Sequence, residues 1–574
     1  MIFIKNNILQ IIYSFFFFIF TGFPFIAFAQ TTYIPLGDKQ YDLLNRLEIK
    51  TDLPNIFFSA IKPYSRRDAV KDVELIDSLF AANDDDETLT DIDKYNMQNL
   101  LMNNSEWSKP SDYYLSKKPV FGKNGIYKTK DNLLEVNNND VFLAVNPVLY
   151  FTVGKEKSNS KIIYQNTRGV NVRGMIDKKI GFYALVTDNQ ERDPAYVMNY
   201  IQKNNAVPGV GNFKQKAYNT RNAIDYLNAT GYATWSVTKF IDMQLGFDKN
   251  FIGDGYRSLL LSDFSNNATF LKINTRLGKF NYENLFMELY QPHFFHAGAN
   301  VLPRKYARFT DLSFNATNWL NVGVFEGLIF ARTDHYPYQY FIPIIFTRYG
   351  NSQPGFDDNQ LIGLHAKANI AHTVQLYGQL ALENLSGLFK SNGYWGNQNG
   401  IQLGIKYPDA LGLKNIDVQL EVNQVRPYTY QHSDSITNYT HYNQPLADPL
   451  GANFREFIAI AKYQPIEKLR LEGQILYYRQ GLDSVVNGNV INYGANPLEN
   501  FDTRPADNGF QIWDGRKSSC LLVSGVVSYE LKENMFIEAT GYYRRFKEAN
   551  TQQQNPLGAT LSFRWNISRR YFNF

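Results

Sequence analysis

The stretch IDVQLEVN, residues 416–423, alternates strictly between apolar and polar side chains. Successive side chains of an extended strand point to opposite faces, so this stretch predicts a strand with one apolar and one wet face. Residues 362–370, 374–382, 469–477 and 535–544 repeat the pattern. Such strands suit a membrane barrel with an apolar outer wall. A soluble, secreted β-sandwich is the alternative, because its strands alternate too.

The connections between these strands alternate between short and long. Short turns are predicted near Asp177-Lys178, Lys239-Phe240, Gly278-Lys279, Asn318-Trp319, Ala371-His372, Asp409-Leu413, Pro465-Lys468 and Lys532-Asn534. Long polar segments cover about 154–160, 189–224, 249–268, 291–306, 331–360, 384–399, 424–456, 479–517 and 544–557. Short turns at one end and long loops at the other are typical of outer-membrane barrels. We therefore predict an all-β transmembrane barrel of about 18 antiparallel strands over residues 131–574.

Composition agrees with a barrel and excludes several other classes. Among 574 residues there are 39 Tyr and 43 Phe, an aromatic content that suits the girdles of a membrane barrel. A mean hydropathy of -0.35 excludes a bundle of transmembrane helices. The formal net charge of +4 gives nucleic-acid binding no electrostatic support. The single cysteine, Cys520, excludes an intramolecular disulfide.

The first 29 residues are predicted to be a signal peptide. Lys5 precedes the apolar run Ile8 to Phe20, and Ala27-Phe28-Ala29 fits a small-x-small cleavage site. The alternative is an uncleaved membrane anchor, since the apolar run is nearly long enough to span a bilayer. Together with the barrel pattern, the signal peptide predicts the outer membrane of a Gram-negative bacterium.

Residues 30–130 are predicted to form a small helical region separate from the barrel. Ser65 with Asp68, and Thr90 with Asp93, have the spacing of helix N-caps with a capping-box partner. The turn count places both ends of the barrel sequence at the short-turn end. We therefore expect the helical region on the periplasmic side.

Three segments resemble the Wzi-like capsule-assembly outer-membrane proteins. They are Gly246 to Phe264 (GFDKNFIGDGYRSLLLSDF), Asn318 to Arg332 (NWLNVGVFEGLIFAR) and Asn438 to Phe457 (NYTHYNQPLADPLGANFREF). The likeness spans nearly the whole mature chain and is greatest to gliding-motility members from Bacteroidetes. It implies an eighteen-stranded barrel with periplasmic helices. It also marks a signature loop whose residues are Asp248, Asn250, Gly253, Asp254, Gly255, Arg257 and Ser258.

The sequence carries no catalytic, cofactor or metal motif. It contains no GxSxG, no HExxH and no phosphate-binding loop. Gly253-Asp254-Gly255 lacks the Lys-Ser/Thr that a phosphate loop needs, so we expect a tight turn with Arg257 paired to a nearby acid. We predict no enzyme activity and no cofactor, with a barrel enzyme acting on lipid or glycan as an alternative.

Aromatic residues of two long segments are candidates for contacts with a surface glycan. They are Tyr336 and Tyr338 in the first segment, and Tyr428, Tyr430, Tyr439, His441 and Tyr442 in the second. Aromatic faces stack on the apolar faces of sugar rings. The alternative is that these residues belong to an aromatic girdle or pack the loops.

These features predict an outer-membrane barrel that organises the cell surface. Members of the resembling family are thought to hold capsular polysaccharide at the surface or to support gliding motility, and fold alone does not choose between these roles. The expected partners are outer-membrane lipid and a surface polysaccharide or adhesin and motility proteins, with no nucleic acid. The alternative function is a porin or diffusion channel, which would need an open lumen.

Overall fold

The structure is a computed structural model of the chain. It describes residues 31–51, 58–80, 88–117, 126–157, 159–214, 223–292, 302–332, 336, 338–346, 358–390 and 393–574, apart from the side chains of Tyr338, Leu388 and Phe389. The predicted signal peptide lies outside the described residues.

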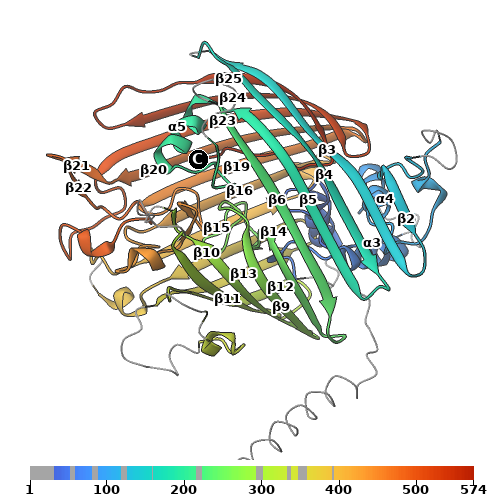
Figure 1. Cartoon of the computed structure of the whole chain (residues 1–574), viewed down its shortest axis with the longest axis horizontal. Helices are drawn as coiled ribbons and strands as arrows, with labels where there is room; N and C mark the ends of the chain where they lie inside the picture. The colour runs from blue at the N-terminus through green and yellow to red at the C-terminus, as the bar shows by residue number, and fades with distance from the viewer. Residues whose placement is uncertain are drawn as a thin grey trace, which may run out of the picture.

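Eighteen antiparallel strands form one closed barrel, which confirms the predicted fold (Figure 1). Each strand pairs with the next, and the last pairs with the first. The strands are β3 (Val141–Glu156), β4 (Ile162–Ile176), β5 (Ile180–Arg192), β6 (Ile224–Ser236), β7 (Ile241–Asp248), β9 (Ala268–Leu277), β10 (Phe280–Tyr290), β11 (Arg304–Asn315), β12 (Leu320–Phe330), β13 (Asn359–Ile370), β14 (Val374–Leu382), β15 (Asn399–Tyr407), β16 (Ile416–Val425), β19 (Phe454–Ile466), β20 (Leu469–Leu482), β23 (Arg516–Lys532), β24 (Met535–Glu548) and β25 (Leu557–Trp565).

The connections also lie where the sequence predicts them, with eight short turns at one end and nine longer loops at the other. The backbone angles of two short turns identify their turn type. Asp177 and Lys178 have φ of 50° and 49°, and Ala371 and His372 have φ of 51° and 53°. Paired positive φ values are those of a type I′ turn, whose twist matches that of the strands it joins. We call the two ends the short-turn end and the long-loop end.

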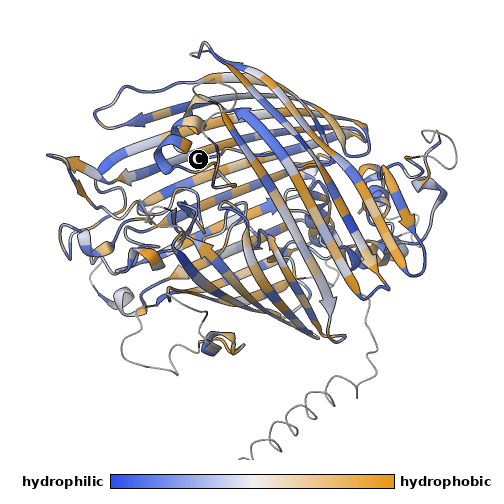
Figure 2. Cartoon of the chain, in the orientation of Figure 1, coloured by the Kyte–Doolittle hydropathy of each residue, from blue (hydrophilic) through white to orange (hydrophobic). Residues whose placement is uncertain are grey.

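Apolar and polar residues alternate along the strands of the barrel wall (Figure 2). Leu364, Leu376, Leu403 and Leu420 are exposed on the outer face. Residues on the opposite face of the same strands, namely Lys367, Gln379, Gln402 and Glu421, are buried in the lumen. The apolar belt is the surface that a bilayer covers in an outer-membrane barrel.

The seam between the last and first strands is closed in two parts. On the β3 side of the seam, β25 pairs with residues 149–156 and leaves the start of β3 free for another strand. The lower part of β3, residues 142–145, pairs instead with β2 (Leu134–Asn137). Leu134 and Val136 of β2 are exposed and continue the apolar belt below β25.

Three helices precede the barrel, namely α2 (Gln40–Thr51), α3 (Arg66–Phe80) and α4 (Asp91–Asn103). Both predicted caps form. Ser65 Oγ accepts the Asp68 N–H at 3.2 Å, while Thr90 Oγ accepts the Asp93 N–H at 3.1 Å. Apolar residues from all three helices share one core. No helix among the described residues is long and apolar enough to cross a bilayer.

A further helix, α5 (Ala195–Asn204), lies in the long loop between β5 and β6, where the sequence predicts only a polar segment. Short antiparallel strand pairs are not part of the barrel wall. They are β1 (Ile61–Lys62) with β8 (Phe251–Ile252), β17 (Thr440–His441) with β18 (Gln444–Pro445), and β21 (Ser484–Val486) with β22 (Asn489–Ile491).

Candidate functional site

The signature loop, residues 249–267, leaves β7 and crosses the lumen to the opposite wall. Gln402 Nε2 of β15 donates to the Arg257 carbonyl at 3.0 Å. Glu421 of β16 accepts the Arg257 N–H at 3.0 Å, and Gln379 of β14 accepts the Leu259 N–H at 2.8 Å. The inward polar face of these strands therefore binds the loop backbone, and the loop obstructs the barrel interior.

Arg257 anchors the far side of this loop, as an acid-paired arginine was expected to do. Its guanidinium lies 3.0 Å from Glu456 and 3.9 Å from Asp448, and it also donates to the Asn573 carbonyl. Burial alone would lower the pKa of Arg257, but the two carboxylates raise it above its ordinary value. The pair is buried and charge-assisted, which makes it costly to break.

The other signature residues also hold the loop in place. Asp254 accepts from Ser59 Oγ at 3.0 Å, and Asn250 Oδ1 accepts from Lys272 Nζ at 3.0 Å. Ser258 Oγ accepts the N–H groups of Leu260 and Leu261.

The two glycines and Asp248 complete the turn. A Cβ on Gly255 would lie 2.7 Å from Glu421 Oε2, and Gly253 has φ of 147°. Asp248 Oδ1 accepts the Lys249 N–H at 2.7 Å. The signature residues therefore fix the path of the loop.

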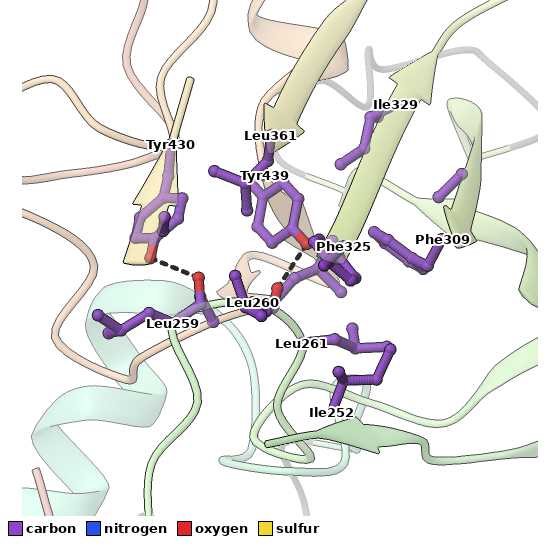
Figure 3. Packing of buried hydrophobic residues seen from close by; sticks show 14 of the residues in the cluster. Ile252, Leu259, Leu260, Leu261, Phe309, Phe325, Ile329, Leu361, Tyr430 and Tyr439 are labelled. Carbon is purple, nitrogen blue, oxygen red and sulfur yellow. Dashed lines mark hydrogen bonds between the residues drawn. The ribbon is translucent and has the colours of Figure 1, made fainter. Parts of the chain in front are cut away.

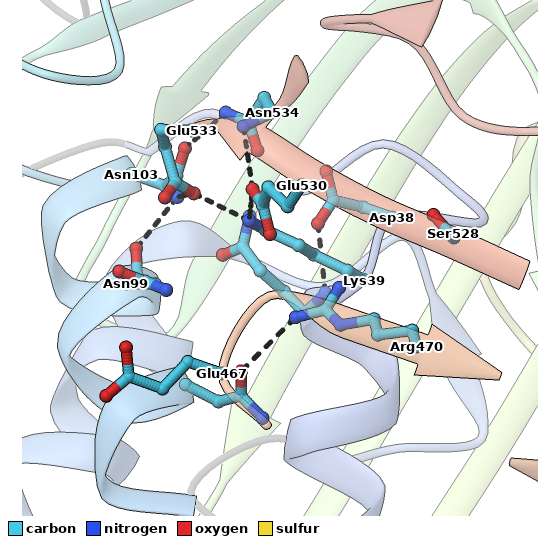
Figure 4. A network of polar contacts seen from close by, with 12 residues as sticks. Asp38, Lys39, Asn99, Asn103, Glu467, Arg470, Ser528, Glu530, Glu533 and Asn534 are labelled. Carbon is cyan, nitrogen blue, oxygen red and sulfur yellow. Dashed lines mark hydrogen bonds and ion pairs between the residues drawn. The ribbon is translucent and has the colours of Figure 1, made fainter. Parts of the chain in front are cut away.

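The helices α2, α3 and α4 with their connections, which we call the helical unit, lie inside the barrel at its short-turn end. The unit is therefore not separate from the wall. Its side chains form ion pairs with strands around the whole circumference. Lys39 is bound by Glu530 and Glu533 at 2.6 Å each, beside Asn103 of α4 (Figure 4). At the turn between β15 and β16, Lys50 binds Asp409 at 2.7 Å.

A third element, residues 566–574, follows β25 and turns into the lumen. Arg570 pairs with Glu191 at 2.7 Å, and Asn573 Nδ2 donates to Gln474 at 2.7 Å. Phe574 packs on Tyr196 and Tyr200 of α5. A chamber of about 670 Å³ remains between the helical unit, the signature loop and this segment.

Most of the predicted glycan-contact residues are buried. Tyr430 donates its hydroxyl to the Leu259 carbonyl at 2.8 Å, and Tyr439 donates to the Leu260 carbonyl (Figure 3). Their rings are fully enclosed, and burial raises the pKa of both hydroxyls well above the ordinary value. These two tyrosines therefore pack the outer loops onto the signature loop and present no face to a sugar.

The other candidates with described side chains are buried or half-buried. Tyr428 is buried and donates to the Asn492 carbonyl at 2.9 Å. His441 is also buried, and this burial lowers its pKa to about 4. Tyr442 is half-buried beside Tyr290, and Tyr336 packs on Phe330. The Tyr338 side chain lies outside the described residues.

An aromatic cluster that the sequence analysis missed lies at the long-loop end. Trp395 is half-buried, with the Phe501 ring centroid 4.8 Å away and the Arg504 guanidinium 4.0 Å from its ring centroid. Asp502 and Asp507, which pair with Arg504, are exposed. We call Trp395, Phe501 and Arg504 the rim cluster. Residue spacing gave no signal for it, because its members come from loops more than a hundred residues apart.

The fold defines a barrel of the outer-membrane type with eighteen strands, whose lumen holds the helical unit, the signature loop and residues 566–574. Comparison with solved structures finds the same fold in Wzi of Escherichia coli, described as an outer-membrane protein involved in group 1 capsule assembly and a carbohydrate-binding β-barrel. The match has a TM-score of 0.57 and 12% identity, and covers 94% of this chain and 100% of Wzi.

Two proteins of Pseudomonas aeruginosa match less well. OprD and OccK3 each have a TM-score of 0.40 and 10% identity, and each match covers 74% of this chain and about 95% of the other. No protein-family model matches the sequence, and the search of curated proteins finds no match.

Proposed function

We propose that this chain is an outer-membrane barrel that binds a polysaccharide at the cell surface through its long loops. The rim cluster carries the proposal. It presents half-buried aromatic rings next to exposed carboxylates and a guanidinium at the end of a filled barrel. Aromatic rings take the apolar face of a sugar, and the charged groups take its hydroxyls. The similarity to a carbohydrate-binding barrel supports this function.

In this proposal the short-turn end and the helical unit face the periplasm, and the loops hold capsular polysaccharide at the surface. Attachment of a surface polymer would also serve gliding motility through the same loops. The filled lumen argues against a porin, because the signature loop, the helical unit and residues 566–574 are bound to the wall by ion pairs and hydrogen bonds.

The test is binding of the detergent-solubilised protein to immobilised capsular polysaccharides, both acidic and neutral, by biolayer interferometry. We expect a double variant, Trp395→Ala with Phe501→Ala, to bind at least tenfold more weakly than the wild type. Trp319→Ala is the matched control, since Trp319 is exposed in a turn at the opposite end. Equal binding by the double variant would overturn the assignment of the rim cluster, and no binding by the wild type would overturn the function.

A further inference from the structure

The wall formed by β10, β11 and β12 has an ion pair on its outer face. Leu285, Phe309 and Phe325 belong to the lumen cluster that contains Tyr439 and the signature loop. Side chains alternate along a strand, so their neighbours Phe286, Arg308 and Glu326 point outward. Arg308 Nη2 lies 2.9 Å from Glu326 Oε2.

Most of the residues directly opposite this pair on the neighbouring strands are apolar. Arg308 is directly opposite Phe286 on one side and Leu328 on the other. Glu326 is directly opposite Ile362 on one side and Thr310 on the other. A charged side chain on the lipid face of a barrel is destabilising, most of all near the middle of the bilayer. Both side chains nevertheless have no exposed surface, so another element covers them.

The cover is a short segment of the loop between β12 and β13, residues 338–346, which we call the strap. Arg308 donates to the carbonyls of Ile344 at 2.8 Å and Ile342 at 3.3 Å. Glu326 accepts the Phe346 N–H at 2.8 Å. The yellow-green helical turn of the strap lies outside the outline of the barrel in Figure 1.

Aromatic contacts fix the strap to the same part of the wall. Tyr340 stacks on Phe330 with ring centroids 4.3 Å apart, and Phe341 lies 5.1 Å from Phe286. The wall and the strap therefore share an apolar contact on the outer face as well as the ion pair.

Several backbone groups of the strap have hydrogen-bond partners. The carbonyls of Ile342 and Ile344 accept from Arg308, and the Pro343 carbonyl accepts from Tyr282 Oη at 3.0 Å. The N–H of Ile344 donates to the Ile342 carbonyl at 2.8 Å, and proline has no N–H. A lipid environment demands this, because unsatisfied backbone groups cost several kcal/mol where water is absent.

The outward surface of the strap is apolar. Phe341, Ile342 and Ile344 are 41%, 44% and 59% exposed. We propose that the strap lies in the hydrocarbon layer as part of the lipid-facing wall, with acyl chains as its partner. Arg308 and Glu326 provide the polar partners that its irregular backbone lacks, and the strap in turn shields the two charges from lipid.

The test places a fluorescent label on the strap and asks which quencher reaches it. Cys520→Ser removes the single native cysteine, and Ile344→Cys is then labelled with a bimane in nanodiscs. Leu403→Cys is the control for lipid contact, and Val485→Cys on the β21–β22 hairpin is the control for water; these sites are 64% and 65% exposed. Heat-dependent migration on gels identifies folded protein.

We expect brominated lipid to quench the Ile344 label as strongly as the Leu403 label, while aqueous iodide quenches only the Val485 label. Glu326→Gln should weaken the bond to the strap and shift the Ile344 label toward iodide quenching. If iodide quenches the Ile344 label in the unaltered strap as it does the Val485 label, the strap lies in water and the proposal is wrong.

Discussion

Replacing Arg257 with methionine tests whether the signature loop is held in the lumen by its buried ion pair. The substitution removes the charge, the hydrogen bonds to Glu456 and the bond to the Asn573 carbonyl, but keeps most of the apolar stem. Glu456 and Asp448 then remain buried without their cation. Breaking a buried pair from one side costs about 3–5 kcal/mol. Each 1.4 kcal/mol is a tenfold change, so the population of the open loop should rise by roughly two to three and a half decades.

Hydrogen exchange followed by mass spectrometry measures this opening directly. Peptides that cover residues 253–261 should lose roughly two to three and a half decades of protection, while the strands of the wall keep theirs. Arg479→Met is the matched control, because Arg479 is exposed on the outer face and its cation contacts the Trp513 ring and the Tyr477 hydroxyl. A loss of protection below tenfold in Arg257→Met would refute the anchoring role, since the loop would then be held by its other contacts alone.

Three further predictions concern the other closures. Gly255→Ala should loosen the signature loop, because the added methyl meets Glu421 Oε2 at 2.7 Å, and exchange over the same peptides would show it. Burial acts to raise the pKa of Asp93, but Arg46 and Lys50 lower it to about 2, so its stabilising effect is present above its ordinary pKa and lost as the pH falls from about 4 to 2. Proteolysis of α4 should therefore increase over that range in the wild type and not in Asp93→Asn. In planar bilayers the wild type should show no steady conductance, and a large open conductance would contradict the filled lumen.

The regular part of this fold could be predicted because its signals are local. Alternation in residues such as Leu364 and Leu376 marks the wall, and the turn at Ala371-His372 follows from where that alternation stops. The capping pairs Ser65–Asp68 and Thr90–Asp93 likewise depend on a spacing of three residues, and both form.

The paths of the long loops could not be predicted, because they depend on contacts distant in sequence. Tyr430 and Tyr439 stand in a polar segment and look like surface residues, yet the signature loop, about 170 residues earlier, buries them. Arg308 shows the same limit on a strand. A charged side chain on the outer wall would destabilise the barrel if it faced lipid. The strap covers Arg308 and accepts its hydrogen bond. The sequence around these tyrosines and around Arg308 gives no sign that another segment covers them.

The divided seam affects how the wall can be completed in a membrane. A free strand edge leaves peptide groups without partners, and lipid offers none. β25 stops at Trp565, so it leaves the lower edge of β3 to a four-residue strand that comes before the barrel in the chain. Pairing along the full length of β3 therefore requires a segment from each end of the barrel sequence. Shortening the linker between the helical unit and β3 would remove β2 and leave the lower edge of β3 unpaired.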